Sequence, residues 1–284
     1  MIDNRPIGMF DSGVGGLTVY KEIKKKIPNE KIIYIGDTKR FPYGSKAKET
    51  IIKASIECIN FLLSKNVKQI VIACGTATSQ ALDTVREIYK VPIEGIISPT
   101  VRYIKKMNYK NVGVIATRGT IKSNAWEEKI REIDNKINVY NKACPLLAPM
   151  AEEGWTDNEI AKLTVKEYLK DFGKLDALVL GCTHFPLYEN IIKEYLPNTE
   201  IINTGKIIAE ELYSIQQKQE EQSIKNNKLN ESYLEQSIKN DKLNESYLEQ
   251  SMKEDEFYLT DTECNFIDVA YKILGKKINI KEMN

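Results

Sequence analysis

The sequence predicts an α/β protein built as two similar doubly wound domains with mainly parallel sheets. Short apolar runs alternate with segments of helical spacing over roughly the first 200 residues, which is typical of a parallel sheet with helices on both faces. One pattern of strand, cysteine and threonine-containing turn occurs twice, at 68–79 and at 175–187. The length of 284 residues also suits two domains.

Apolar runs rich in Ile, Val and Leu, bounded by Gly, Pro or polar residues, predict the strands. In chain order these are Ile7–Phe10, Lys31–Ile35, Gln69–Ala73, Ile93–Ile97, Val112–Ala116 and Ala177–Leu180. Helices are predicted between them, where apolar residues recur every three or four positions: Leu17–Lys26, Lys48–Leu63, Ala77–Tyr89, Thr100–Met107, Lys122–Ile133 and Glu159–Phe172. In such sheets, chemistry sits at the carboxyl ends of the strands, so residues there are the candidates for a site.

Composition and charge narrow the class of protein. Lys and Arg number 41 against 40 Asp and Glu, a formal net charge of +1, so no steady attraction to nucleic acid or an anionic membrane is expected. Apolar runs stay short of the roughly 18–20 residues of a membrane span. The N-terminus has no apolar stretch of signal-peptide length. We expect a cytoplasmic enzyme that acts on a small molecule, with no nucleic-acid or membrane partner.

Cysteine and histidine usage argues against bound metal. The five cysteines stand at wide spacings without any C-x-x-C, so neither a disulfide scaffold nor a zinc ribbon is expected. His184 is the only histidine, which removes any site with several imidazole ligands. The sequence therefore predicts no metal site.

Cys74 and Cys182 occupy the same place in the two similar units, 108 residues apart. A strand-to-helix turn would place each thiol at a helix N-terminus, where the macrodipole and free N–H groups favour the thiolate. A cleft between two such halves would hold two facing sulfurs. A pair of acid–base groups on opposite faces of a carbon removes a proton from one side and delivers one to the other. The pattern predicts a two-base racemase.

Polar residues near the strand ends are candidates to assist these thiols. His184 follows Cys182 by two positions, close enough to orient that thiol or relay its proton; the alternative is a histidine satisfied in the core. Asp11 ends the first strand and Asp37 ends the second, although either carboxylate alternatively caps the following helix. Further groups suited to recognising a small dianionic amino acid are Ser12, Pro42, Tyr43, Gly44, Thr76 and Thr183.

The glycine-rich run at 13–16 matches neither G-x-G-x-x-G nor G-x-x-x-x-G-K-[ST], so it indicates nucleotide binding only weakly. Its backbone N–H groups are suited to binding a carboxylate.

Two other classes of protein stay open beside the racemase. A non-catalytic thiol or metal-binding α/β protein would need closer cysteine spacing or more histidines, and a nucleotide-binding doubly wound domain would need a true phosphate loop.

The segment after Leu212 differs in kind from the rest. QSIKNNKLNESYLE at 222–235 recurs almost unchanged at 236–249, and a third copy begins at 250. Its apolar residues spread around a helical wheel instead of forming a coiled-coil seam. We expect a polar, partly helical surface insertion at about 216–256 with no catalytic role.

Motifs along nearly the whole chain resemble those of the cofactor-independent aspartate/glutamate racemase superfamily, and of its glutamate racemases in particular. They are DSGVGGLTV at 11–19, GDTKRFPYG at 36–44, VIACGTAT at 71–78, ACPLLAPMAEEG at 143–154, LGCTHFPL at 180–187 and FYLTD at 257–261. The resemblance implies two α/β domains around the active site, usually in a homodimer, and cofactor-free interconversion of L- and D-glutamate that supplies D-glutamate for peptidoglycan. An aspartate racemase or a broader-specificity racemase of the superfamily is the alternative.

The resemblance also implies roles for individual residues. Cys74 matches the thiol that deprotonates the D-enantiomer, and Cys182 matches the one that acts on the L-enantiomer. Asp11 and His184 match the groups beside the first and second thiol. Further matches are Asp37 and Glu152 for catalysis, and Ser12, Pro42, Tyr43, Gly44, Gly75, Thr76 and Thr183 for substrate binding.

One departure falls inside the site. Gly75 stands where the family normally has Asn, so an amide that would contact substrate is absent.

We expect a first domain of 1–97 plus 209–284, from which the insertion emerges, and a second domain of 98–208.

Overall fold

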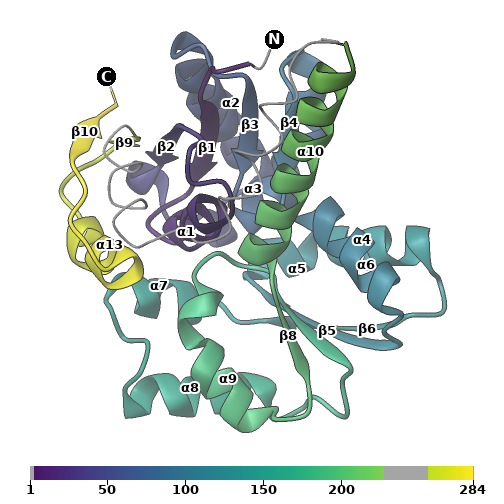
Figure 1. Ribbon diagram of the computed structural model, residues 1–284. Coiled ribbons are helices and arrows are strands. Elements are labelled where there is room, and N and C mark those ends of the chain that lie inside the picture. The colour runs from purple at the N-terminus through teal and green to yellow at the C-terminus, as the bar shows by residue number, and fades with distance from the viewer. Residues whose placement is uncertain (1–2, 227–254, 284) are drawn as a thin grey trace.

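Two parallel sheets organise the chain, one above the other in Figure 1. The computed structural model describes residues 3–226 and 255–283. One sheet has the strand order β10-β9-β2-β1-β3-β4, and the other has the order β6-β5-β7-β8. Every strand pairing in these ranges is parallel. The prediction of an α/β protein with two mainly parallel sheets is confirmed.

The first sheet takes strands from both ends of the chain, and the second takes its strands from the middle. The first comprises β1 (Ile7–Asp11), β2 (Ile32–Gly36), β3 (Gln69–Ile72), β4 (Ile93–Gly95), β9 (Glu256–Leu259) and β10 (Ile280–Glu282). The second comprises β5 (Asn111–Ala116), β6 (Asn138–Ala143), β7 (Ala177–Leu180) and β8 (Glu200–Asn203). The division at 97/98 and 208/209 into two domains stays a prediction.

Helices cover both faces of each sheet. In the first sheet, α2 (Lys48–Ser64) and α3 (Gly75–Ile88) pack on one face, and α1 (Gly16–Lys26), α10 (Thr204–Asn226) and α13 (Phe266–Leu274) on the other. In the second, α4 (Ile97–Met107) and α6 (Ala125–Ile133) oppose α7 (Leu147–Glu152), α8 (Glu159–Leu169) and α9 (Glu189–Tyr195). Four short helices lie in the connections between these elements: α5 (Arg118–Lys122), η1 (Thr38–Arg40), η2 (Tyr43–Ser45) and η3 (Phe185–Tyr188).

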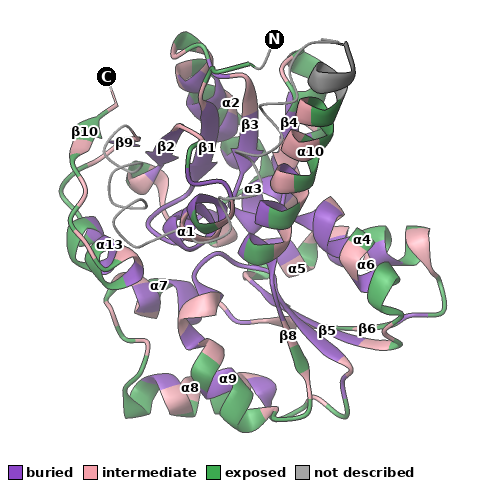
Figure 2. Cartoon of the chain, in the orientation of Figure 1, coloured by how far each residue is buried: buried purple, intermediate pink, exposed green. Residues whose placement is uncertain are grey.

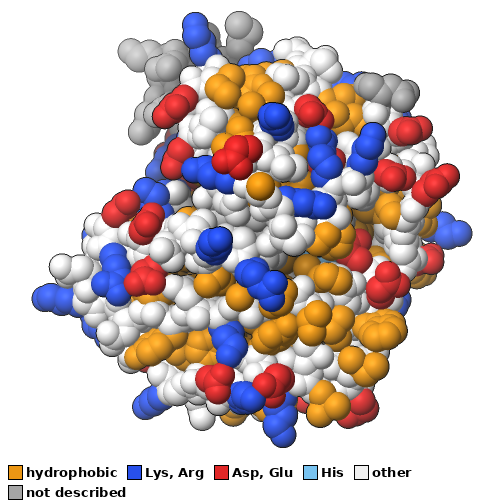
Figure 3. Space-filling view, turned by 180° about the vertical axis from the view of Figure 1, so that it is seen from behind, with side chains coloured by type: hydrophobic (Ala, Val, Ile, Leu, Met, Phe, Trp, Pro, Cys, Tyr) orange, Lys and Arg blue, Asp and Glu red, His pale blue; other side chains and the backbone are white. Residues whose placement is uncertain are grey.

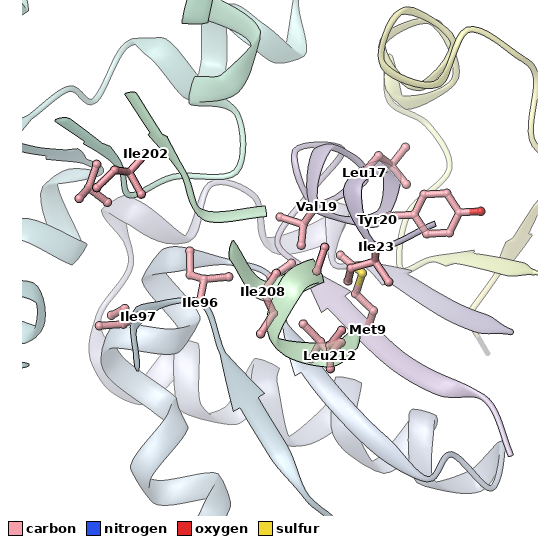
Figure 4. Packing of buried hydrophobic residues seen from close by; sticks show 14 of the residues in the cluster. Met9, Leu17, Val19, Tyr20, Ile23, Ile96, Ile97, Ile202, Ile208 and Leu212 are labelled. Atoms are coloured by element: carbon pink, nitrogen blue, oxygen red, sulfur yellow. The ribbon is translucent and has the colours of Figure 1, made fainter. Parts of the chain in front are cut away.

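The central strands are buried on both faces, as Figure 2 shows for β1 and β3. Successive residues therefore serve different clusters: Met9 faces the core with α1 and α10, and Phe10 faces the core with α2 and α3. The first of these cores continues into the second sheet through α4 and α10. Figure 4 shows Ile208 and Leu212 of α10 beside Met9 in this shared core.

Some strands and helices differ from the sequence prediction, because a proline or a polar sequence hides the expected pattern there. The strand predicted over Ile93–Ile97 ends at Gly95, and α4 already begins at Ile97 because its first turn accommodates Pro99. Strands β6 and β8 were not predicted. Both lie at edges of the second sheet, and β6 carries the polar sequence NVYNKA, so neither has the apolar run of a central strand.

The expected insertion at about 216–256 begins within a helix, and its expected end coincides with the start of a strand. Helix α10 continues to Asn226, and Glu256 already begins β9. Residues 227–254, which hold most of the repeats, lie outside the described residues, so their surface position and lack of catalytic role stay predictions. No helix in the described ranges is long and apolar enough to cross a membrane.

Asp255, at the start of the second described range, contacts α1 and the start of β2 in the first sheet. Its carboxylate lies 3.1 Å from Nζ of Lys24, and it accepts hydrogen bonds from the Tyr20 hydroxyl (2.6 Å) and the backbone N–H of Ile32 (2.7 Å). The Lys24 and Asp255 side chains are 2% and 0% exposed. A buried ion pair with its remaining bonding capacity satisfied is costly to break from one side only, because the other charge stays buried.

Replacing Lys24 by Met should lower the free energy of unfolding by about 3–5 kcal/mol, because it leaves the Asp255 carboxylate without its cation. Lys25→Met is the matched control on the same helix, since the Lys25–Glu22 pair has a half-exposed lysine and should contribute at most about 1 kcal/mol. Urea denaturation of both variants measures the difference. Equal small losses would contradict a structural role for the buried pair.

Candidate active site

The carboxyl ends of the strands in the two sheets meet at the centre of the molecule. Asp11 of β1 accepts a 3.1 Å hydrogen bond from the Thr183 hydroxyl, which follows β7. The Thr18 hydroxyl donates to the Thr183 carbonyl at 2.7 Å. These bonds cross from one sheet to the other. Residues that the sequence places at the strand ends of the two sheets therefore lie together where the sheets join.

Cys74 caps α3, as the strand-to-helix turn predicts. Its Sγ accepts from the Ala77 N–H at 3.5 Å and lies 3.7 Å from the Ser12 hydroxyl, to which the thiol donates. Burial, reinforced by the negative charge of Asp11, nevertheless raises the pKa of Cys74 to about 12. The expectation that the helix N-terminus would favour a thiolate is therefore wrong for this cysteine, because burial outweighs the helix terminus. Cys74 holds its proton at neutral pH.

Asp11 is a carboxyl group close enough to Cys74 for its charge to affect that thiol, and its own pKa lies near neutral pH. It is fully buried, and it accepts from the Gly13 N–H at 3.1 Å as well as from Thr183. Burial raises the pKa of Asp11 to about 6, although the positive charge of His184 opposes that rise. Helix α1 has no side-chain cap, so the alternative interpretation of Asp11 as its cap is wrong.

Cys182 has a different pair of partners. Its Sγ lies 3.8 Å from Nδ1 of His184, and Nε2 of the same ring lies 2.6 Å from Oε1 of Glu152. Burial alone would lower the pKa of His184, but the hydrogen bonds to Cys182 and Glu152 raise it well above 6.5. His184 is thus both a buried, satisfied histidine and a direct partner of the second thiol. The sequence predicted His184 beside Cys182, and the structure places Glu152, which the family resemblance implied, at the other nitrogen of the same ring.

The glycine-rich run at 13–16 binds a carboxylate through a backbone N–H, and this carboxylate is a side chain of the protein itself. Oε1 of Glu152 accepts a 3.0 Å hydrogen bond from the backbone N–H of Val14. The run approaches so closely that a Cβ on Gly15 would lie 2.4 Å from Nδ1 of His184. Glycine is needed here because any side chain would displace the imidazole.

The hydrogen bonds of the Asp37 carboxylate involve neither Cys74 nor Cys182. Its carboxylate accepts from Nε of Arg40 (2.7 Å), from the Thr260 hydroxyl (2.8 Å) and from the Tyr43 hydroxyl. It makes no side-chain cap to η1, so the capping alternative is wrong here too. Its described contacts anchor the loop that carries Pro42, Tyr43 and Gly44, and a role for Asp37 in proton transfer stays a prediction.

A cluster of three threonine hydroxyls spans the junction. Oγ1 of Thr76 lies 2.8 Å from Oγ1 of Thr117 and 3.1 Å from that of Thr120, and the latter two are 3.0 Å apart. Gly44 packs against the same cluster, since a Cβ there would lie 2.4 Å from Cβ of Thr117. Sequence reasoning missed Thr117 and Thr120, although Thr117 directly follows β5, the position that singled out the other candidates.

All five cysteines are free thiols, and within the described ranges no group of three or more His, Cys, Asp or Glu side chains is placed to hold a metal ion. Fold and site together define an α/β protein with two buried thiols, each with its own polar partners, between two parallel sheets. The chain belongs to the Asp/Glu/Hydantoin racemase family, whose model matches residues 7–212.

Relatives that match it over most of its length include glutamate racemases. The chain is 51% identical over 214 residues to the glutamate racemase of Sulfurihydrogenibium sp. (strain YO3AOP1), covering 74% of this chain and 82% of that protein. It is 45% identical over 208 residues to the enzyme of Aquifex aeolicus (strain VF5), covering 72% and 81%. The crystal structure of the Francisella tularensis subsp. tularensis SCHU S4 glutamate racemase in complex with D-glutamate superposes with a TM-score of 0.81 at 36% identity, covering 100% and 98%.

Replacing Glu152 by Gln should lower the pKa of His184, because the amide cannot stabilise the imidazolium as the carboxylate does. His184 is the only histidine, so its ring resonances in an NMR pH titration are unambiguous. In the unmodified protein the ring should stay protonated through neutral pH, and in the variant it should lose its proton at lower pH. The neighbouring exposed Glu153, changed to Gln, is the control and should leave the titration unchanged. Equal shifts in both variants would contradict the assignment of Glu152.

Proposed function

We propose that the protein interconverts L- and D-glutamate with Cys74 and Cys182 as opposed acid–base groups on the two faces of Cα. The observation that carries this proposal is the presence of one buried thiol on the strand-end turn of each sheet, 5% and 6% exposed, each with a separate carboxylate or imidazole partner. The relatives that cover most of the chain at 45–51% identity are named glutamate racemases, which favours glutamate over aspartate.

In the L-to-D direction, Cys182 takes the Cα proton as a thiolate that His184 stabilises. The raised pKa of His184 supplies a positive charge beside that thiolate. Cys74 then delivers its proton to the opposite face, a role that suits a thiol whose pKa is raised to about 12. The burial of both sulfurs keeps water from competing for the carbanion.

In the D-to-L direction the roles reverse. Cys74 must first lose its proton, and Asp11 is the nearby base whose pKa of about 6 leaves it ionised at neutral pH. Cys182, with His184 beside it, then acts as the acid. The two halves therefore assist their thiols by different means, with a carboxylate on one side and an imidazole backed by Glu152 on the other.

Substrate carboxylates are recognised in this proposal by hydroxyl and N–H groups, since Ser12, Thr76 and Thr183 lie beside the thiols or bridge the sheets. The product D-glutamate would supply peptidoglycan synthesis in the cytoplasm.

A homodimer is part of the proposal. Leu146, Ile160 and Leu163 are exposed on the second half of the chain and line an apolar hollow of about 310 Å³. Figure 3 shows hydrophobic side chains gathered on the lower part of the face seen from behind.

Cys74→Ser and Cys182→Ser separate a two-base from a one-base mechanism, because a hydroxyl is far less acidic than a thiol. The unmodified enzyme should erase the circular dichroism of L-glutamate without added cofactor, and act on L-aspartate far more slowly. Both variants should lose racemisation. With threo-3-chloroglutamate, which eliminates chloride after proton loss, Cys74→Ser should act on the L-configured isomer and Cys182→Ser on the D-configured one.

Two results would count against the proposal. If both cysteine variants eliminated from the same enantiomer, the thiols would not face opposite sides of Cα. If either variant racemised glutamate at close to the original rate, that thiol would not be a required base.

A further inference from the structure

Glu152 is held at its backbone as well as at its carboxylate. It is the last residue of α7, and the carbonyls of residues 149–151 accept N–H groups from the turn that follows this helix. The carbonyl of Glu152 itself accepts a 3.3 Å hydrogen bond from Nδ2 of Asn265, which lies 113 residues further along the chain. Asn265 directly precedes α13, so this bond joins the end of α7 to the start of another helix.

Helix α13 is fixed to the first sheet, whereas α7 packs on the second. Phe266 and Ile273 are buried in the core that α13 shares with α1, and Nζ of Lys21 on α1 donates to the Ile273 carbonyl at 2.6 Å. Figure 1 shows α13 next to α7. A second bond joins them, since Nζ of Lys272 donates to the Gly154 carbonyl at 3.4 Å. The first sheet therefore supplies a support for the end of α7.

The carboxylate of Glu152 needs such a support. Its Oε1 meets both the Val14 N–H at 3.0 Å and Nε2 of His184 at 2.6 Å, and both contacts require one placement of the side chain. Helix α7 has only six residues, so it has few hydrogen bonds of its own. The position of its last residue therefore depends on contacts with other elements, of which the bond from Asn265 is the one made to Glu152's own backbone carbonyl.

We propose that Asn265 is a positioning residue, which holds the backbone of Glu152 so that its carboxylate stays on His184. For its effect on the reaction, this inference rests on the proposed two-thiol racemisation. Because His184 is the partner of Cys182, the contact supports the thiol on the second sheet. Cys74 has different partners, so its half of the reaction is independent of this support.

The first test is Asn265→Ala, with the titration of His184 followed by NMR. A carboxylate that is held less firmly stabilises the imidazolium less, so the pKa of His184 should fall, though by less than in Glu152→Gln. The other ionisable groups that act on the ring, Cys182 and Asp11, are unchanged in this variant. Asn265→Gln keeps an amide that can donate, and it should restore the titration towards that of the unmodified protein.

Combining two substitutions decides whether Asn265 acts through Glu152. In Glu152→Gln the carboxylate is already gone, so adding Asn265→Ala should shift the titration no further. Ile267→Ala is the matched control, because Ile267 is an exposed residue of the same helix, and it should leave the titration unchanged. Asn265 is exposed and its side chain makes no cap bond to α13, so Asn265→Ala should fold as the control does.

The reaction should change on one side only. One net hydrogen bond corresponds to roughly 2- to 10-fold in an equilibrium or a rate. Asn265→Ala should therefore slow elimination from L-configured threo-3-chloroglutamate, which uses Cys182, by up to that factor, with KM nearly unchanged. Elimination from the D-configured isomer, which uses Cys74, should keep its original rate.

Three results would overturn the inference: an unchanged His184 titration in Asn265→Ala, an equal shift with and without the Glu152 carboxylate, or equal slowing of elimination from both isomers. The cysteine variants keep the two proposals distinguishable. If they racemise glutamate, the proposed function fails, while the titration still decides whether Asn265 holds Glu152. If they lose racemisation and the titration of Asn265→Ala is unchanged, only this inference fails.

Discussion

A single carboxylate oxygen holds the second half of the site against the first. Oε1 of Glu152 accepts the Val14 N–H from the glycine-rich loop and lies 2.6 Å from Nε2 of His184, whose other nitrogen faces Cys182. The loop, the imidazole and the thiol are thus fixed by one acceptor whose side chain is only 17% exposed. The cross-sheet bond from Thr183 to Asp11 fixes the other side of the same junction. These contacts and the core that the two sheets share bring the two thiol-bearing strand ends together.

Burial at this junction shifts the pKa values of its ionisable groups. It raises the pKa of Cys74 to about 12 and that of Asp11 to about 6, which leaves a protonated thiol beside a carboxylate at neutral pH. On the opposite side, hydrogen bonds to Cys182 and Glu152 raise the pKa of His184 in spite of burial. Two chemically different supports for two thiols suit a reaction that must run from either face of the substrate.

Sequence reasoning located the residues at strand ends but not the contacts between the sheets. Cys74, Cys182, Asp11 and His184 were found because each follows or ends an apolar run, and parallel strands place such positions at one edge. The edge strand β6 was missed because its polar sequence lacks that signal. The pairing of Glu152 with Val14, 138 residues apart, and the hydrogen bond from Asn265 to the Glu152 carbonyl depend on how the two sheets meet, which local pattern does not encode. At Cys74, burial raises the pKa of the thiol more than the N–H groups at the start of α3 lower it.

The most direct test of opposed thiols is the fate of the Cα hydrogen when L-glutamate is converted in D2O and followed to low conversion by mass spectrometry after separation of the enantiomers. With separate bases on the two faces, the D-glutamate first formed should carry deuterium at Cα, and the L-glutamate that remains should keep its protium. If the early D-glutamate retained the substrate's own hydrogen, one base would serve both faces, and the account of two thiols held apart across the junction would be wrong.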